Sequence, residues 1–78
     1  MGLSLQSTIK VKEAFNEIFP GVKQKIIDEK SDGSAEAITV TVERIDRFAF
    51  LSIAEVMEQV GNSFIVKRSG EKITLGFY

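Results

Sequence analysis

The stretch FIVKRSGEKITLGFY, residues 64–78, decides the fold that this sequence predicts. Two runs of alternating apolar and polar residues flank the Ser69-Gly70 pair, a pattern typical of a β-hairpin with a tight turn. With this turn, Val66 lies opposite Ile73, and a shift of one residue would mix polar and apolar side chains on both faces. Five apolar side chains then share one face of the hairpin: Phe64, Val66, Ile73, Leu75 and Phe77.

The same register places the charged residues near the turn. Arg68 faces Glu71 on the apolar face, and Lys67 faces Lys72 on the opposite face. Like charges directly opposite each other destabilise an antiparallel pair, although exposed lysines can splay into water. The lysine pair therefore marks the outer face of the hairpin without by itself requiring an anion.

A second hairpin is predicted upstream, from residues 22–30 and 34–45. A two-residue turn would set lysines opposite valines. A three-residue loop at 31–33 instead sets apolar residues opposite each other and puts Gly33 at the left-handed position that such loops require. The predicted pairs are Val22 with Val42 and Ile26 with Ile38.

The first helix is predicted at residues 8–19, with Ser7 or Thr8 as its N-cap. Pro20-Gly21 ends it, because proline cannot continue the hydrogen-bond ladder and glycine accepts the exit conformation. Its apolar stripe comprises Val11, Ala14, Phe15, Ile18 and Phe19. A strand over residues 3–11 is the competing interpretation, since apolar residues also alternate there.

A short second helix is predicted at residues 53–60. Ser52 and Glu55 have the spacing of a capping box, and Gly61 is a helix stop. Phe48 and Phe50 precede this helix as a strand extension or as a packed approach loop.

Together these segments predict one domain over residues 1–78. The fold class is α+β, a two-layer sandwich in α-β-β-α-β-β order, with two helices packed on one face of a four-stranded antiparallel sheet. This order resembles that of LAGLIDADG homing endonuclease cores. Neither helix carries that family's motif or its terminal catalytic acid, so the resemblance implies no nuclease activity here.

The composition narrows the class of protein. Ten basic and 11 acidic residues give a net charge of −1, which does not favour a general nucleic-acid coat. The chain has no cysteine, so disulfides cannot supplement its small core, and we expect a homo-oligomer, most simply a dimer. No run of about 20 apolar residues or secretory signal is present. We expect a cytoplasmic protein that does not enter membranes.

Catalytic chemistry has few candidate residues. Without histidine or cysteine, the commonest general base and the thiol nucleophiles are missing. Glu13 and Glu17 are one helical turn apart and fit a solvated helix face better than a cation site. Ser52 fits a cap better than a nucleophile. We expect a non-enzymatic protein without cofactor or metal.

The sheet face away from the helices is the predicted recognition surface. Its candidate binding residues are Lys23, Lys25, Ile27, Ile65, Lys67, Lys72, Thr74 and Tyr78, and Thr39, Thr41 and Glu43 share the face. Ile27 and Ile65 beside Tyr78 would form a modest apolar association patch. The lysines with Tyr78 would suit a nucleic-acid backbone, although sheet-based RNA readers usually present more than one aromatic residue.

These features predict a small interaction or regulatory module. We expect it to self-associate or to bind a protein partner through the open sheet face or through a C-terminal edge strand. The alternative is a nucleic-acid-binding protein that uses the lysine patch on the same sheet face.

Overall fold

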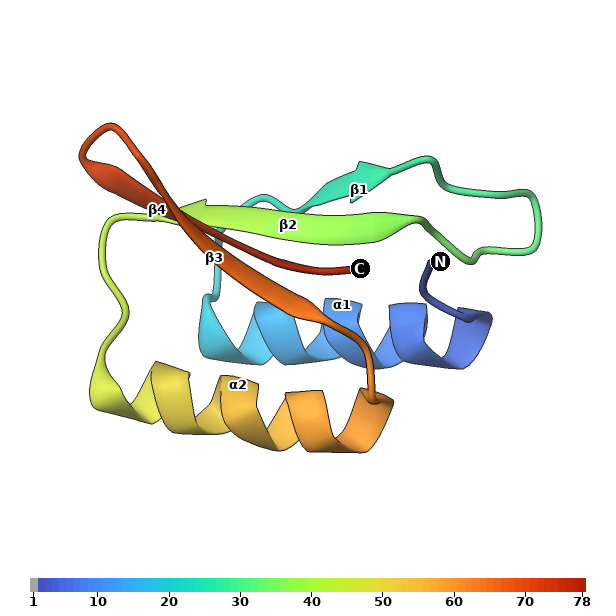
Figure 1. Ribbon diagram of the computed structural model, residues 1–78, viewed down its shortest axis with the longest axis horizontal. Helices are drawn as coiled ribbons and strands as arrows, with labels where there is room; N and C mark the ends of the chain where they lie inside the picture. The colour runs from blue at the N-terminus through green and yellow to red at the C-terminus, as the bar shows by residue number, and fades with distance from the viewer. Residues whose placement is uncertain (1) are drawn as a thin grey trace.

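Two helices pack on one face of a four-stranded sheet in the computed structural model, which describes residues 2–78 (Figure 1). The predicted α+β class and the order of elements are confirmed. The elements are α1 (Leu5–Ile18), β1 (Lys25–Ile27), β2 (Ala37–Val42), α2 (Arg47–Val60), β3 (Phe64–Ser69) and β4 (Lys72–Phe77). Neither helix of the described chain is long and apolar enough to cross a membrane.

The strand order in the sheet is β1-β2-β4-β3, with every neighbouring pair antiparallel. The C-terminal strand β4 is therefore an inner strand, and the prediction of a C-terminal edge strand is wrong. Leu75 and Phe77 on β4 are fully buried, which fits a strand that has a neighbouring strand at each edge. The edges are β1 and β3.

Helix α1 begins at Leu5, earlier than predicted, because Ser4 is its N-cap: the Ser4 hydroxyl accepts a hydrogen bond from the Ser7 backbone N–H at 3.1 Å. The strand interpretation of residues 3–11 is wrong from Leu5 onward. Leu3 alone keeps strand-like pairing, since its N–H donates to the carbonyl of Ala35 at 2.8 Å.

Helix α2 begins at Arg47, five residues before the predicted cap. The carboxylate of Asp46 accepts a hydrogen bond from the Ala49 N–H at 2.8 Å, so Asp46 is the N-cap and Ser52 lies inside the helix. The capping box at Ser52 is wrong, as are the strand and loop interpretations of residues 48–50. Gly61 ends the helix as predicted, with φ 69°.

The first hairpin has the predicted register, with Ile26 opposite Ile38. Lys30 donates its N–H to the Ser34 carbonyl at 2.7 Å across the three-residue loop, and Gly33 has φ 94°. At this loop the Asp32 carboxylate accepts hydrogen bonds from both the hydroxyl and the backbone N–H of Ser34. These bonds favour the ionised carboxylate and lower the pKa of Asp32.

The first strand is shorter than predicted, so the pairing of Val22 with Val42 does not form in the ladder. The Gln24 side chain binds α1 instead. Its amide donates hydrogen bonds to the Lys12 backbone carbonyl at 2.9 Å and to the Asn16 side-chain oxygen at 3.1 Å. The segment before Lys25 is thus held by the helix and not by β2.

The second hairpin is shifted by two residues from the predicted register. Lys67 lies opposite Thr74, and Ser69 opposite Lys72, which leaves a two-residue turn at 70–71. The prediction that Lys67 faces Lys72 is therefore wrong, together with the Ser69-Gly70 turn and the opposition of Arg68 to Glu71. A type II′ turn places glycine at its first central position, and Gly70, with φ 65°, occupies that position.

A shift of two residues leaves every side chain on its predicted face, because side chains alternate with a period of two. Leu75 and Phe77 accordingly point into the core with Val40 of β2. Phe77 packs against Phe15 of α1, with ring centroids 5.7 Å apart, and against Phe64 of β3 at 4.8 Å. The contact between Phe15 and Phe77 joins the helical layer to the sheet, and that between Phe64 and Phe77 joins two neighbouring strands.

The core contains one buried hydroxyl whose removal should stabilise the protein. Thr8 is fully buried, and its Oγ1 has no hydrogen-bond partner within residues 2–78. We expect Thr8→Val to raise the free energy of unfolding by about 1 kcal/mol, because the isosteric methyl needs no partner. Urea unfolding measures this change. Thr41→Val, at an exposed position, serves as the control, and a destabilised Thr8→Val would contradict the assignment.

The cap of α2 can be tested by two matched substitutions. Asp46→Ala should lower the free energy of unfolding by about 1 kcal/mol because it removes the acceptor for the Ala49 N–H. Ser52→Ala should change it by less than about 0.5 kcal/mol, because alanine is favoured inside a helix. Thermal and urea unfolding of both variants give the comparison, and a larger loss for Ser52→Ala would contradict this cap.

Candidate interaction surface

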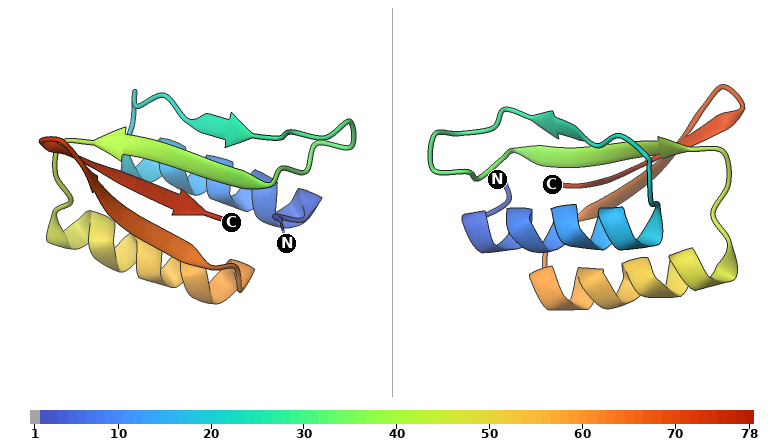
Figure 2. Two further views of the ribbon diagram at one scale, coloured as in Figure 1. Left: turned by 45° about the horizontal axis from the view of Figure 1, so that its top comes forward. Right: turned by 180° about the vertical axis from the view of Figure 1, so that it is seen from behind.

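The outer face of the sheet is left uncovered by the helices, which lie together on the inner face (Figure 2). Cross-strand rows define this face. One row runs from Lys25 through Thr39 and Gly76 to Ile65. The next row runs from Thr41 through Thr74 to Lys67, and the two threonine hydroxyls lie 3.2 Å apart.

The centre of the outer face carries small residues. A Cβ added at Gly76 would lie 2.7 Å from the Thr39 Cγ2, so the threonine methyl already covers this glycine. Ala37 continues the same small-residue strip on β2. Larger side chains flank this strip, from β1 (Lys25 and Ile27) and from β3 (Ile65 and Lys67).

Six of the predicted site residues lie in strands on this face: Lys25, Ile27, Ile65, Lys67, Lys72 and Thr74. Lys23 precedes β1 and lies outside the ladder. Tyr78 follows β4, and its backbone exchanges hydrogen bonds with Ser63 at 3.0 and 3.2 Å. The structure thus collects most of the predicted residues on one face but separates Lys67 from direct opposition to Lys72.

The apolar residues of this face differ in accessibility. Ile65 is 43% exposed and Tyr78 is 48% exposed, whereas Ile27 is half-buried. Ile65 and Tyr78 stand on the β3–β4 side of the sheet and Ile27 on the β1 side. The accessible apolar surface is therefore concentrated toward the β3 edge.

The first turns of α2 carry the most exposed large apolar side chains. Phe48 is 71% exposed, Phe50 64% and Leu51 57%. Sequence reasoning missed them as surface residues because it placed the start of the helix after them. Asp46, three residues before Ala49, was the available signal, since aspartate is among the preferred N-cap residues.

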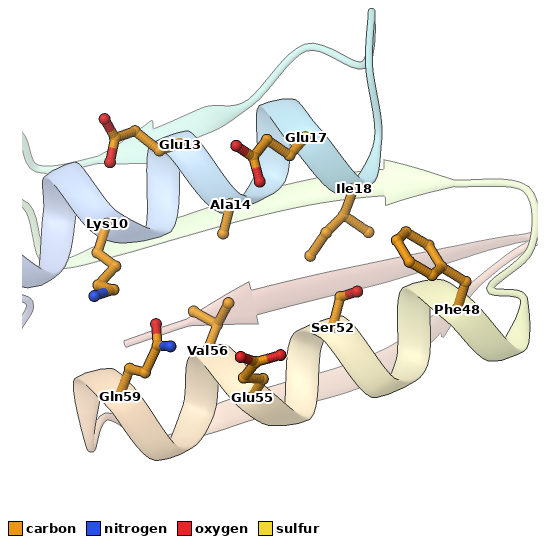
Figure 3. Close-up of a pocket in the computed structure, with 10 residues that line it drawn as sticks. All are labelled: Lys10, Glu13, Ala14, Glu17, Ile18, Phe48, Ser52, Glu55, Val56 and Gln59. Carbon is orange, nitrogen blue, oxygen red and sulfur yellow. The ribbon is translucent and has the colours of Figure 1, made fainter.

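A groove of about 300 Å³ separates α1 from α2 (Figure 3). Phe48 stands at one end near Ile18, and Ser52 and Glu55 of α2 face α1 across it. Glu13 and Glu17 of α1 also border the groove and are exposed, as expected of a solvated helix face. Within residues 2–78, no three acidic side chains are grouped closely enough to hold a metal ion.

Comparison of the chain with models of known protein families gave no match, and comparisons with curated proteins and with solved structures gave none. A function for this chain must therefore be inferred from its own surfaces. Those surfaces are the outer sheet face, the β3 edge, the exposed turns of α2 and the groove between the helices.

Proposed function

We propose that this protein is a small non-enzymatic interaction module that self-associates through the part of the sheet that no helix covers. The main support is the outer face itself, where Ile65 and Tyr78 remain about half exposed beside the β3 edge. Exposed apolar residues that share an uncovered sheet face are typical of an association surface. The lack of cysteine in the chain fits a reducing compartment, and we propose a cytoplasmic location.

Chain size supports self-association on energetic grounds. A domain of this size buries only about 60% of the surface of its unfolded chain, so the stability of a monomer is marginal. Without disulfides, a second copy is a common way to bury further apolar surface. A partner that binds only the folded chain also stabilises the folded state by mass action.

The proposal predicts an oligomeric state that depends on concentration. Sedimentation from low to high micromolar concentration should show a transition from the mass of one chain to that of two. The melting temperature should rise over the same range, because dimerisation stabilises the folded state. The mass of one chain throughout the range would contradict self-association.

A second candidate function, nucleic-acid binding, is favoured by the lysines on the same face. Three lysines lie next to threonines and a glycine on this face: Lys25, Lys67 and Lys72. Tyr78 adds one aromatic ring. Such a face can neutralise phosphates and stack one base.

This candidate predicts salt-sensitive binding of a short single-stranded oligonucleotide, measured by fluorescence anisotropy. The double variant Lys67→Glu, Lys72→Glu should weaken binding and reduce the salt slope by about 1 for each phosphate that is no longer neutralised. Lys10→Glu on α1 makes the same kind of charge change in the helical layer and should have little effect. No binding at low salt, or binding unchanged by the double variant, would exclude this function.

A further inference from the structure

The long unpaired edge of the sheet is β3. It has six residues, all exposed except the half-buried Phe64. The opposite edge, β1, has three residues and ends before Asp28, whose φ of 51° interrupts the strand. A long regular edge is a template for a further strand, whereas a short interrupted edge is not.

The hydrogen bonds between β3 and β4 show which β3 backbone groups are free. Ser63 and Tyr78 exchange both of their backbone hydrogen bonds, so they form a hydrogen-bonded pair of the antiparallel ladder. Because such pairs alternate along a ladder, Phe64, Val66 and Arg68 direct their N–H and C=O groups away from β4. These three residues are available to pair with another strand.

The side chains of β3 make this strand complementary to an antiparallel copy of itself. Its first half is apolar, and its second half contains Lys67 and Arg68. Centred on Val66, a second copy sets Phe64 opposite the partner's Arg68 and Ile65 opposite the partner's Lys67. The partner's guanidinium would then approach the Phe64 ring, and the lysine stem would cover Ile65.

Other registers of the same pairing are less favourable. Moving the partner by two residues in one direction sets Lys67 opposite the partner's Lys67, and like charges directly opposite are destabilising. Moving it in the other direction leaves Arg68 opposite a residue that precedes the partner's β3. The register centred on Val66 is the one that uses all three free positions on both strands.

Helix α2 presents apolar side chains on the side that such a pairing would approach. Ser52 and Glu55 face α1 (Figure 3), and at about 100° per residue Phe50 and Met57 lie on the opposite side of the helix. Figure 2 shows α2 on the β3 side of the helical layer. Val66 on the inner face of β3 is 54% exposed, so apolar surface accompanies the free edge.

We propose that two copies of this chain pair antiparallel through β3, with Val66 opposite the partner's Val66, so that the two sheets form one continuous sheet across a twofold axis. This inference rests on the proposed self-association and assigns the contact to the β3 edge instead of the outer face of the sheet. The occupant is a second copy because, in this register, the apolar half of each β3 lies opposite the cationic half of the other, so one sequence supplies both sides of the pairing.

Substitutions at Val66 test the interface by sedimentation. Val66→Pro removes an N–H that points away from β4, a position at which an edge strand tolerates proline. Val66→Lys places like charges opposite each other at the twofold axis. Both should raise the dimer dissociation constant by about 100-fold or more. Ile9→Lys, an apolar-to-lysine change at a half-exposed residue of α1, is the matched control and should remain dimeric.

Cysteine cross-linking tests the register, and the absence of native cysteine makes it specific. Opposed residues of a hydrogen-bonded pair have Cα atoms about 5.5 Å apart, within disulfide range. Val66→Cys should therefore form a covalent dimer under mild oxidation. Ser69→Cys, on the same strand, would lie about 20 Å from its counterpart and should not cross-link.

The outcomes separate this inference from the broader proposal. Circular dichroism first confirms that each variant is folded. Persistent dimers of both Val66 variants, or cross-linking by Ser69→Cys but not by Val66→Cys, would overturn the β3 pairing and leave self-association standing. Loss of the dimer in Ile27→Lys, which changes the outer face, with both Val66 variants still dimeric, would assign self-association to the outer face. A wild-type chain that is monomeric at every concentration would overturn both.

Discussion

The pairing of β2 with β4 is the constraint on which the rest of the structure depends. Within residues 2–78, β1–β2 and β3–β4 are hairpins formed by neighbours in the sequence, and the β2–β4 ladder joins them into one sheet. Val40 lies opposite Leu75 in this ladder, and both are buried. Phe77, on the same strand, contacts Phe15 of α1. The sheet face on which the helices pack therefore forms only when the two hairpins pair through β2 and β4.

The sequence predicted the face of each strand residue better than its partner, and the reason is physical. Faces follow from a period of two and survive the two-residue error in the second hairpin. The partner depends on the turn, where Ser69-Gly70 and Gly70-Glu71 both place glycine in a tight turn. Helix starts were missed for a related reason, because Asp46 and Ser52 are both good caps and only packing of Ala49 in the core selects the first.

The same difference between local and long-range information decides which features of the candidate surface the sequence predicts. Alternation alone places Lys25, Ile65 and Lys67 on the outer face, and the structure has them there. Which strand forms the edge depends on the order of strands, a contact between segments far apart in the chain, and no local pattern specifies it. The sequence therefore predicted an exposed edge strand but assigned this position to the C-terminal strand β4. The edge strand is instead β3, which forms a hairpin with β4.

The central position of β4 also explains why β3 is exposed on both faces. Two-stranded ribbons twist more strongly than strands held between neighbours, and the β3–β4 turn lies well away from the helices in Figures 1 and 2. This twist carries Val66 and Arg68 out of the helical layer, although their side chains point to its side of the sheet. The first residue of β3, Phe64, remains packed on Phe77. One end of β3 is thus anchored in the core, and the rest is held as a pre-formed strand whose outward backbone groups have no partner among residues 2–78.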